Sequence, residues 1–188
     1  MNIITIRELH KKVKEFEGRE LELCGWVRSV RASKNFGFIV LHDGTFFEPV
    51  QIVYDEKIEN FDAVSKLNVG TALIVKGKVI LTPEAKQPFE IHATEVFVEG
   101  ASTPDYPLQK KRHSLDFLRT IAHLRPRANT FNAVFRVRSV VSAAIHEFFQ
   151  NRNFVYIHTP LITASDCEGA GEMFQVTTLD LNNIPLTE

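Results

Sequence analysis

Five short segments of alternating hydrophobic residues in the first 100 residues constrain the fold of this 188-residue chain most. In the first segment, Glu20–Val30, residues Leu21, Leu23, Gly25 and Val27 share one face, which is the two-residue period of a half-buried strand. The other four segments with strand character are Phe36–Leu41, Val50–Tyr54, Ala72–Leu81 and Phe89–Val98.

Two amphipathic helices are predicted beside these strands, over Arg7–Phe16 and Glu56–Leu67, because their hydrophobic residues recur at helical spacing. The second helix falls between the third and fourth strands. Five strands with a helix at that point are the element order of an OB-fold barrel, and an SH3-like barrel is the alternative. The sequence therefore predicts an all-β, five-stranded OB-fold barrel for this part of the chain.

The rest of the chain has a different pattern. Gly100–Leu108 is small, polar and proline-bearing, which is typical of an exposed connection. Thr130–Asn151 predicts a long helix with one buried stripe, and Phe154–His158 predicts a buried strand. We therefore expect a barrel domain over 1–100, a hinge or linker over 101–120, and the start of an α+β domain over 121–188.

Charge is distributed unevenly along the chain. Lys and Arg outnumber Asp and Glu by 9 to 3 over residues 101–152, whereas residues 153–188 carry 0 against 5. A basic block of this kind suits a polyanion such as nucleic acid, although a merely solvated charged surface is the more common explanation. Charge alone therefore supports nucleic-acid binding only weakly.

Several classes of function find no support. No apolar run approaches the ~20 residues of a membrane span, and the first residues lack a secretory-signal layout, so we expect a cytoplasmic protein without membrane insertion. The seven histidines lack the spacing of zinc ligands. Gly169-Ala170-Gly171 lacks the preceding strand and the glycine spacing of a dinucleotide fingerprint.

The first three strands carry the candidate binding residues. Single-stranded nucleic acid requires flat rings for unstacked bases, cations for phosphates and amides for base edges. Arg31, Phe36, Phe38 and Gln51 supply these groups on or beside the strands. The spacing leaves an alternative open, because Phe36 and Phe38 share one face of their strand and would equally suit a core.

Long blocks of the chain, in order, resemble one family. The blocks are CGWVRSVRASKNFGFIVLHDG (24–44), TPEAKQPFEIHATEV (82–96), LRTIAHLRPRANTFNAVFRVRS (118–139) and FVYIHTPLITASDCEGAGEMFQVTTLDL (154–181). They closely resemble bacterial-type asparaginyl-tRNA synthetases, class II enzymes of the aspartyl/asparaginyl subgroup. The resemblance implies an OB-fold anticodon-binding domain, a hinge and a catalytic domain built on an antiparallel sheet. It also implies asparagine–tRNA ligase activity, in which an asparaginyl-adenylate forms before transfer to tRNA(Asn).

The resemblance also implies roles for single residues of the barrel. Phe38 matches the ring on which the central anticodon uridine stacks, and Gln51 matches the amide that reads the edge of that base. Arg31 matches a backbone or base contact beside them. Glu90 matches the position that reads the first anticodon base.

Further positions are implied in the second half. Thr130–Leu161 resembles class II motif 1, a helix and a strand that end at Pro160 and serve homodimer formation. Glu168 matches the carboxylate that holds the α-ammonium group of asparagine. Nothing in the chain resembles motifs 2 and 3, which bind ATP with Mg²⁺ in the intact enzyme. We therefore expect an N-terminal fragment that has no catalytic residue of its own and is inactive alone.

Two alternatives to this interpretation remain. The chain could be a stand-alone tRNA-binding OB module without catalysis, although such a module has no use for motif 1. It could also belong to an aspartyl-tRNA synthetase, since both enzymes read the same central anticodon base. The blocks SDCEGAGEMF and STPDYPLQKKRHS resemble the asparaginyl enzymes.

Overall fold

The structure is a computed structural model that describes residues 3–85, 87–162, 169, 171 and 176–183. Its contacts divide the chain into two compact units, Met1–Val141 and Ser142–Glu188. The elements are α1 (Ile6–Phe16), β1 (Glu20–Ala32), β2 (Phe36–His42), β3 (Val50–Asp55), α2 (Phe61–Val64), β4 (Ala72–Leu81), β5 (Phe89–Gly100), α3 (Leu115–Thr120), the 3-10 helix η1 (Arg125–Arg127) and α4 (Asn129–Gln150).

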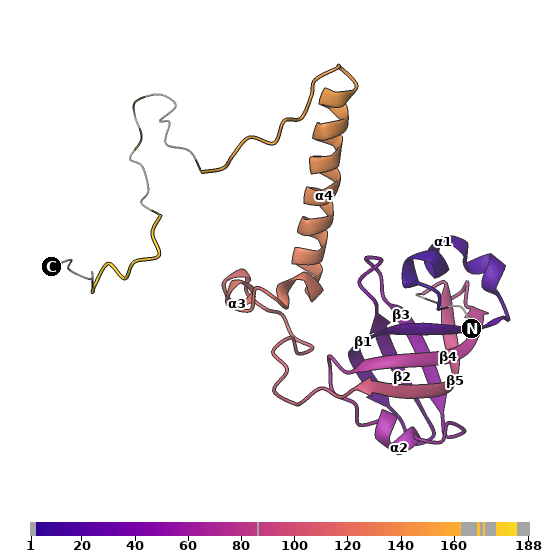
Figure 1. The fold of residues 1–188 in the computed structure, drawn as a ribbon. Coiled ribbons are helices and arrows are strands. Elements are labelled where there is room, and N and C mark those ends of the chain that lie inside the picture. Colours follow the sequence, from indigo (N-terminus) through magenta and orange to yellow (C-terminus); the bar gives the residue numbers. More distant parts are fainter. Residues whose placement is uncertain (1–2, 86, 163–168, 170, 172–175, 184–188) are drawn as a thin grey trace. The chain divides into compact units, whose positions relative to one another are not determined.

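The five strands form a closed barrel in the order β1-β2-β3-β5-β4 (Figure 1). Four neighbouring pairs are antiparallel, and β3 runs parallel to β5. The parallel pair requires a long crossover, which contains α2 and β4. This is the OB-fold topology that the order of elements predicts, and the SH3-like alternative is wrong.

Alternation along the strands builds the core. Leu21, Leu23 and Val27 of β1 are at most 4% exposed, as their shared face predicts. Ile6 and Leu9 of α1 are fully buried in the same cluster. Each large aliphatic side chain buried in this way stabilises the fold by about 1.5–3 kcal/mol.

A β-bulge in β1 decides which face its last residues occupy. β1 pairs with β4 through Trp26 and with β2 from there onward, and the register shifts between Val27 and Ser29. Without the extra residue, the two-residue period that starts at Leu21 would turn Arg31 into the core. The bulge reverses the alternation, so that Arg31 lies exposed opposite Phe38 while Val30 packs inward opposite Ile39.

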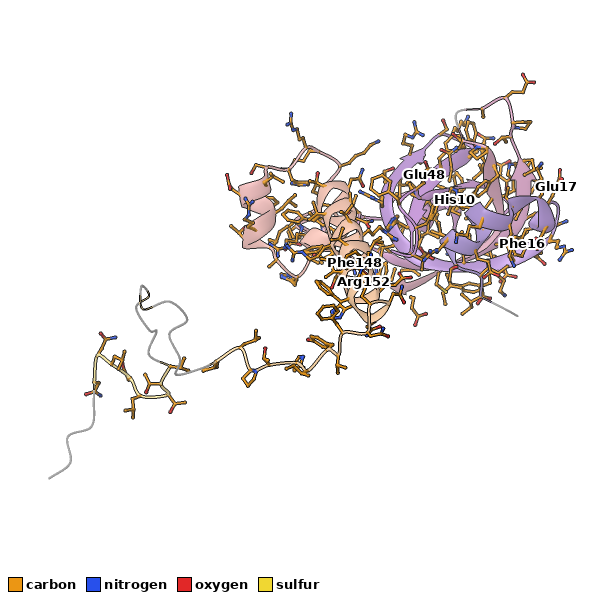
Figure 2. The ribbon with its side chains drawn as sticks, turned by 90° about the horizontal axis from the view of Figure 1, so that it is seen from above. His10, Phe16, Glu17, Glu48, Phe148 and Arg152 are labelled. Carbon is orange, nitrogen blue, oxygen red and sulfur yellow. The ribbon has the colours of Figure 1, made fainter. Side chains whose placement is uncertain are left out.

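α1 covers one end of the barrel, as Figure 1 shows. The Thr5 hydroxyl accepts from Glu8 N at 3.1 Å, and Asp43 Oδ2 in the β2–β3 loop accepts from Ile6 N at 2.8 Å. Further along the helix, His10 stacks on Phe46, and its Nδ1 lies 3.9 Å from Glu48 Oε2 (Figure 2). These contacts hold α1 against the β2–β3 loop. The amphipathic pattern alone does not specify this position of the helix.

The helix predicted over Glu56–Leu67 is wrong in extent, because only Phe61–Val64 is helical. Asp55 Oδ1 accepts from Lys57 N at 3.0 Å, which stabilises a turn instead of the first helical turn. The predicted spacing still identifies buried positions, because Ile58 and Val64 are 4% and 0% exposed.

The strand predicted over Phe154–His158 is also wrong. The segment has no ladder partner among the described residues, and its side chains are mostly exposed, from 61% at Tyr156 to 83% at Val155. A strand requires a neighbour to accept and donate its backbone hydrogen bonds, so hydrophobic composition alone does not form one.

The long predicted helix is confirmed as α4, but its predicted buried stripe is wrong, because Asn132 is the only buried residue described in it. The C-terminal end of α4 agrees with the prediction and has a physical cause. Asn153 adopts a left-handed conformation with φ 64°. Phe154 N then donates to Phe149 O at 3.2 Å, and Asn153 N donates to Gln150 O at 3.0 Å. The Phe149 and Phe154 rings pack edge to face with centroids 5.4 Å apart, which completes a Schellman cap.

Candidate nucleic-acid interface

An exposed pair of rings lies on β2. Phe36 is 45% exposed and Phe38 is half-buried, whereas Gly37 and Ile39 between and after them are buried. The two rings meet edge to face with centroids 5.6 Å apart. The alternative that both phenylalanines belong to the core is therefore wrong.

A cation lies against this pair. The guanidinium carbon of Arg31 is 5.7 Å from the centroid of the Phe38 ring, and the two residues are cross-strand partners. The arrangement places a positive charge beside an exposed aromatic surface, as binding of a base and its phosphate requires.

An amide and a carboxylate complete the surface, which we name the Phe38 face and define as Arg31, Phe36, Phe38, Gln51 and Glu90. Gln51 lies on β3 opposite Val40, two register positions along the ladder from the Phe38–Val53 pair. Its Nε2 donates to Glu90 Oε1 at 2.7 Å, across the parallel β3–β5 pair. The fold thus brings together four strands whose residues are up to 59 positions apart in the sequence.

Two polar residues of this face escaped the sequence analysis. Gln87, in the β4–β5 turn, donates through Nε2 to the same Glu90 oxygen that receives Gln51. His92 lies two residues after Glu90, and its Nε2 is 3.8 Å from Glu90 Oε2. The alternation Glu90, Ile91, His92 signals that both polar side chains share the outer face, but nothing in the sequence pairs Gln87 with them.

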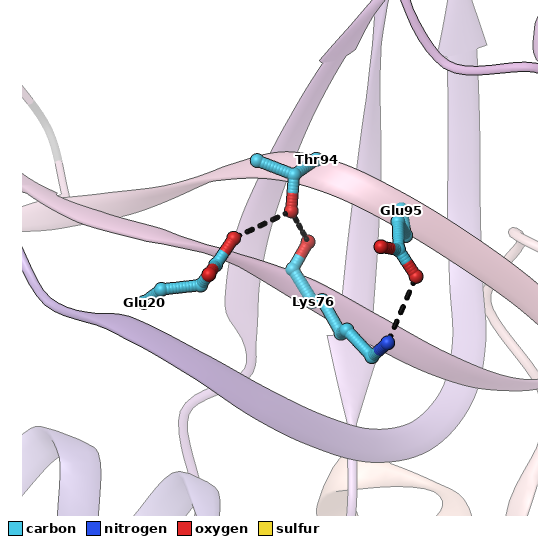
Figure 3. A network of polar contacts seen from close by, with 4 residues as sticks. All are labelled: Glu20, Lys76, Thr94 and Glu95. Atoms are coloured by element: carbon cyan, nitrogen blue, oxygen red, sulfur yellow. Dashed lines mark hydrogen bonds and ion pairs between the residues drawn. The ribbon is translucent and has the colours of Figure 1, made fainter. Parts of the chain in front are cut away.

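A different outer surface of the barrel, formed by β1, β4 and β5, is acidic. Lys76 Nζ lies 2.9 Å from Glu95 Oε2, and Thr94 Oγ1 lies within hydrogen-bonding distance of both Glu20 Oε1 and the Lys76 carbonyl (Figure 3). Burial and the negative charges of Glu22 and Glu99 raise the pKa of the Cys24 thiol on the same strands. An excess of carboxylates repels phosphate, so this surface suits nucleic acid less well than the Phe38 face does.

A cleft of about 1850 Å³ lies between the barrel and the segment after it, within the first compact unit. Arg127 stacks on Trp26 with its guanidinium carbon 4.3 Å from the ring, and its Nη1 donates to Tyr106 Oη at 3.2 Å. Burial lowers the pKa of Arg28 in this cleft, although the guanidinium stays protonated. Part of the basic block of the sequence therefore lines a cleft and is not simply solvated.

Comparisons with known proteins follow the same division of the chain. Residues 21–99 match the family described as an OB-fold nucleic acid binding domain, and residues 114–185 match class II tRNA synthetases (D, K and N). The asparagine–tRNA ligase of Clostridium tetani is 60% identical over 98% of this chain and 40% of its own length. That of Acetivibrio thermocellus is 60% identical over 100% of this chain and 41% of its own length.

The chain belongs to the asparaginyl-tRNA synthetase family. It spans about 40% of the length of the curated relatives that it matches. The solved asparaginyl-tRNA synthetase of Pyrococcus horikoshii with asparaginyl-adenylate has a TM-score of 0.82 at 22% identity, over 94% of this chain and 41% of that one. The aspartyl-tRNA synthetase of Entamoeba histolytica has a TM-score of 0.69 at 23% identity, over 85% and 39%. At these identities the two structures support the fold alone.

Two positions implied by the resemblance to asparaginyl-tRNA synthetases lie outside the barrel. Pro160 follows the irregular segment after α4 and is exposed. Glu168 lies outside the described residues, so its assignment to asparagine stays a prediction. In the described ranges no three His, Cys, Asp or Glu side chains are grouped to hold a metal ion. None of the helices found there has both the length and the hydrophobicity to cross a membrane.

Proposed function

We propose that this asparaginyl-tRNA synthetase chain contributes anticodon recognition to an asparagine–tRNA ligase. In a protein of its relatives' full length, asparagine would be activated with ATP and transferred to tRNA(Asn) in the cytoplasm. The observation that carries the proposal is 60% identity to asparagine–tRNA ligases over nearly the entire chain. That full-length enzyme would use ATP with Mg²⁺, and the solved Pyrococcus horikoshii enzyme has asparaginyl-adenylate bound.

The central anticodon uridine would bind between a ring and an amide. Stacking on Phe38 contributes about 1–3 kcal/mol and tolerates any base. Discrimination therefore falls to the Gln51 amide, whose one N–H is engaged by Glu90. Its other N–H and its carbonyl oxygen remain for the O4 and N3–H of uridine. Arg31 would contact the backbone or base beside them, and Glu90 would read the first anticodon base.

The second half of the chain would form a homodimer contact. The side chains of Val137, Val140, Ile145 and Phe148 on α4 are between 50% and 68% exposed. A row of exposed apolar residues on one helix is typical of a protein–protein interface. With the segment that ends at Pro160, α4 would supply the motif 1 interface, and Glu168 would hold the α-ammonium group of asparagine.

We also propose the division into an anticodon-binding domain over 1–100, a hinge over 101–120 and the start of the catalytic domain over 121–188. The matched families leave residues 100–113 uncovered, which favours a boundary there. The synthetase match over 114–185 disfavours a stand-alone tRNA-binding module. The structural likeness covers both asparaginyl- and aspartyl-tRNA synthetases and does not separate the two substrates. The sequence identity to asparagine–tRNA ligases favours asparagine over aspartate.

Binding of short RNA hairpins tests the anticodon assignment. A hairpin that presents GUU, the anticodon for asparagine codons, is titrated against the chain and against its Phe38→Ala and Gln51→Ala variants. Loss of the stacking ring weakens binding by roughly 5- to 150-fold, which corresponds to 1–3 kcal/mol. Gln51→Ala instead removes the preference for GUU over GCU.

Phe97→Ala is the matched control, because Phe97 is an exposed ring (46%) with Lys76 Nζ 5.2 Å from its centroid, but on the acidic surface. It leaves binding unchanged. Equal weakening by Phe38→Ala and Phe97→Ala would refute the assignment of anticodon binding to the Phe38 face.

A further inference from the structure

The β4–β5 turn holds Gln87 against the Phe38 face. Thr82 Oγ1 donates to the Gln87 carbonyl at 2.8 Å, and Thr82 N donates to the Pro88 carbonyl at 2.9 Å. These bonds close the turn at its base. The Gln87 backbone is thereby fixed three residues before Glu90, and its side chain reaches the carboxylate.

Two carboxamides converge on one oxygen of Glu90. Gln51 donates from β3 and Gln87 donates from the turn, both to Oε1. A carboxylate oxygen has two lone pairs, so Oε1 has no remaining capacity. In the part of the chain that the structure describes, Oε2 accepts no hydrogen bond, and His92 Nε2 lies 3.8 Å from it.

This arrangement fixes the orientation of the carboxylate and leaves one acceptor for a ligand. The Glu90 side chain is only 15% exposed, so its rotation is restricted on both sides by the two amides. Guanine presents two adjacent donors, N1–H and N2–H, on its Watson–Crick edge, whereas adenine presents the N6–H donor beside the N1 acceptor. A single fixed oxygen therefore favours guanine only as long as the carboxylate does not turn.

We propose that Gln87 is a positioning residue for base recognition. It does not contact the RNA, but with Gln51 it holds Glu90 so that Oε2 faces the first anticodon base. The inference rests on the proposed function and deepens it. It also links the two base-reading groups, because the carboxylate that selects the first base is the one that orients the Gln51 amide for the central base.

The test uses the chain with hairpins that carry GUU, AUU or GCU in the loop, at one fixed salt concentration. Fluorescence anisotropy gives the dissociation constants, and the first-base ratio is Kd for AUU divided by Kd for GUU. Gln87→Ala lowers this ratio roughly three- to tenfold, the effect of one hydrogen bond. Its affinity for the AUU hairpin changes less, since adenine offers the fixed oxygen only N6–H, beside the repelling N1 acceptor.

Thr94→Ala is the matched control, because the Thr94 hydroxyl also contacts a glutamate on another strand, but on the acidic surface (Figure 3). It leaves both the first-base ratio and the preference for GUU over GCU unchanged. A drop in the first-base ratio for both variants would refute a specific role of Gln87.

Gln87→Glu separates positioning from loss of fold. Its new carboxylate repels Glu90 at pH 7.5 and shares a proton with it at pH 5, because close carboxylates raise one pKa of the pair. The first-base ratio of this variant therefore recovers on acidification, which a merely unfolded variant would not do. An absent recovery would overturn the proposal.

The two proposals fail differently. If the unmodified chain prefers GUU but Gln87→Ala keeps the full first-base ratio, the positioning role is wrong and anticodon binding stands. If the unmodified chain binds all three hairpins equally, the anticodon assignment itself is wrong, and the role of Gln87 falls with it.

Discussion

At the scale of single residues, His42 is held in its neutral form. Its Nε2 donates to the Phe46 carbonyl at 2.9 Å, and its Nδ1 accepts from Gly44 N at 3.1 Å. The neutral ring is therefore satisfied at both nitrogens, and a second proton would break the Gly44 bond. Burial lowers the pKa of His42, and the nearby Arg28 guanidinium lowers it further.

Stability of the barrel should fall on mild acidification. The unfolded chain takes up the His42 proton near pH 6.5, whereas the folded chain takes it up at lower pH, so acid favours unfolding. His42 therefore does not reduce the free energy of unfolding above pH 6.5, and it reduces it progressively as the pH falls through that value towards the folded pKa. Thermal unfolding between pH 7.5 and 5.5 should show a smaller loss of Tm in His42→Gln than in the unmodified chain.

The exposed His123 provides the control for this experiment. His123→Gln should retain the full pH dependence of the unmodified chain. If both variants keep the same slope, His42 does not carry the effect.

At the scale of elements, three consecutive residues of β2 contribute to both the inner and the outer face of the barrel. Phe36 and Phe38 present their rings outward, while Gly37 faces inward against Tyr54, which is 1% exposed. A Cβ at position 37 would overlap the Tyr54 ring. The glycine thus lets a buried tyrosine lie directly beneath the two exposed rings.

Gly37→Ala should therefore destabilise the barrel. The added methyl group forces the Tyr54 ring or the β2 backbone to move, which costs about 1–3 kcal/mol in a well-packed core. Chemical denaturation should report this loss as a lower midpoint with an unchanged slope. Gly100→Ala on β5 is the comparison, because its Cβ would meet only Ala72 Cβ at 3.7 Å, and it should change stability little.

At the scale of the first compact unit, polar and stacking contacts hold the segment after the barrel. Asn68 Nδ2 donates to the Ser102 carbonyl at 2.9 Å, and Arg136 Nη2 donates to the Gly44 carbonyl at 2.6 Å. Arg127 stacks on Trp26 as a third contact. Contacts of this type are individually weak, so the segment is expected to open locally before the barrel unfolds.

Arg127→Ala should loosen this segment without melting the barrel. It removes a cation–π contact of about 0.5–2 kcal/mol, and trypsin cleavage after Lys110, Lys111 or Arg112 should rise by roughly 2- to 30-fold. Arg138→Ala is the control, since Arg138 lies 5.8 Å over Phe135 on its own helix. Unchanged cleavage in Arg127→Ala, or equal acceleration in both variants, would contradict the role of Arg127.

Local patterns in the sequence determine much of this protein. The two-residue alternation identifies the five strands and the inner face of β1, because adjacent side chains of a strand point to opposite faces. Turn residues and the position of the helical segment then favour the OB-fold order over an SH3-like barrel. Resemblance to the asparaginyl-tRNA synthetases identifies Phe38, Gln51 and Glu90 as candidate binding residues, but it does not show which residues they contact.

Only the tertiary structure decides how those residues meet. The bulge that turns Arg31 outward and the β3–β5 pair that joins Gln51 to Glu90 depend on interactions between residues distant in sequence. The irregular segment Phe154–His158 makes the same point, because an apolar, β-branched run becomes a strand only beside another strand. The periodicity of hydrophobic residues indicates which side of an element is buried. A binding surface also depends on which elements are neighbours, and the free energy of the whole barrel decides that.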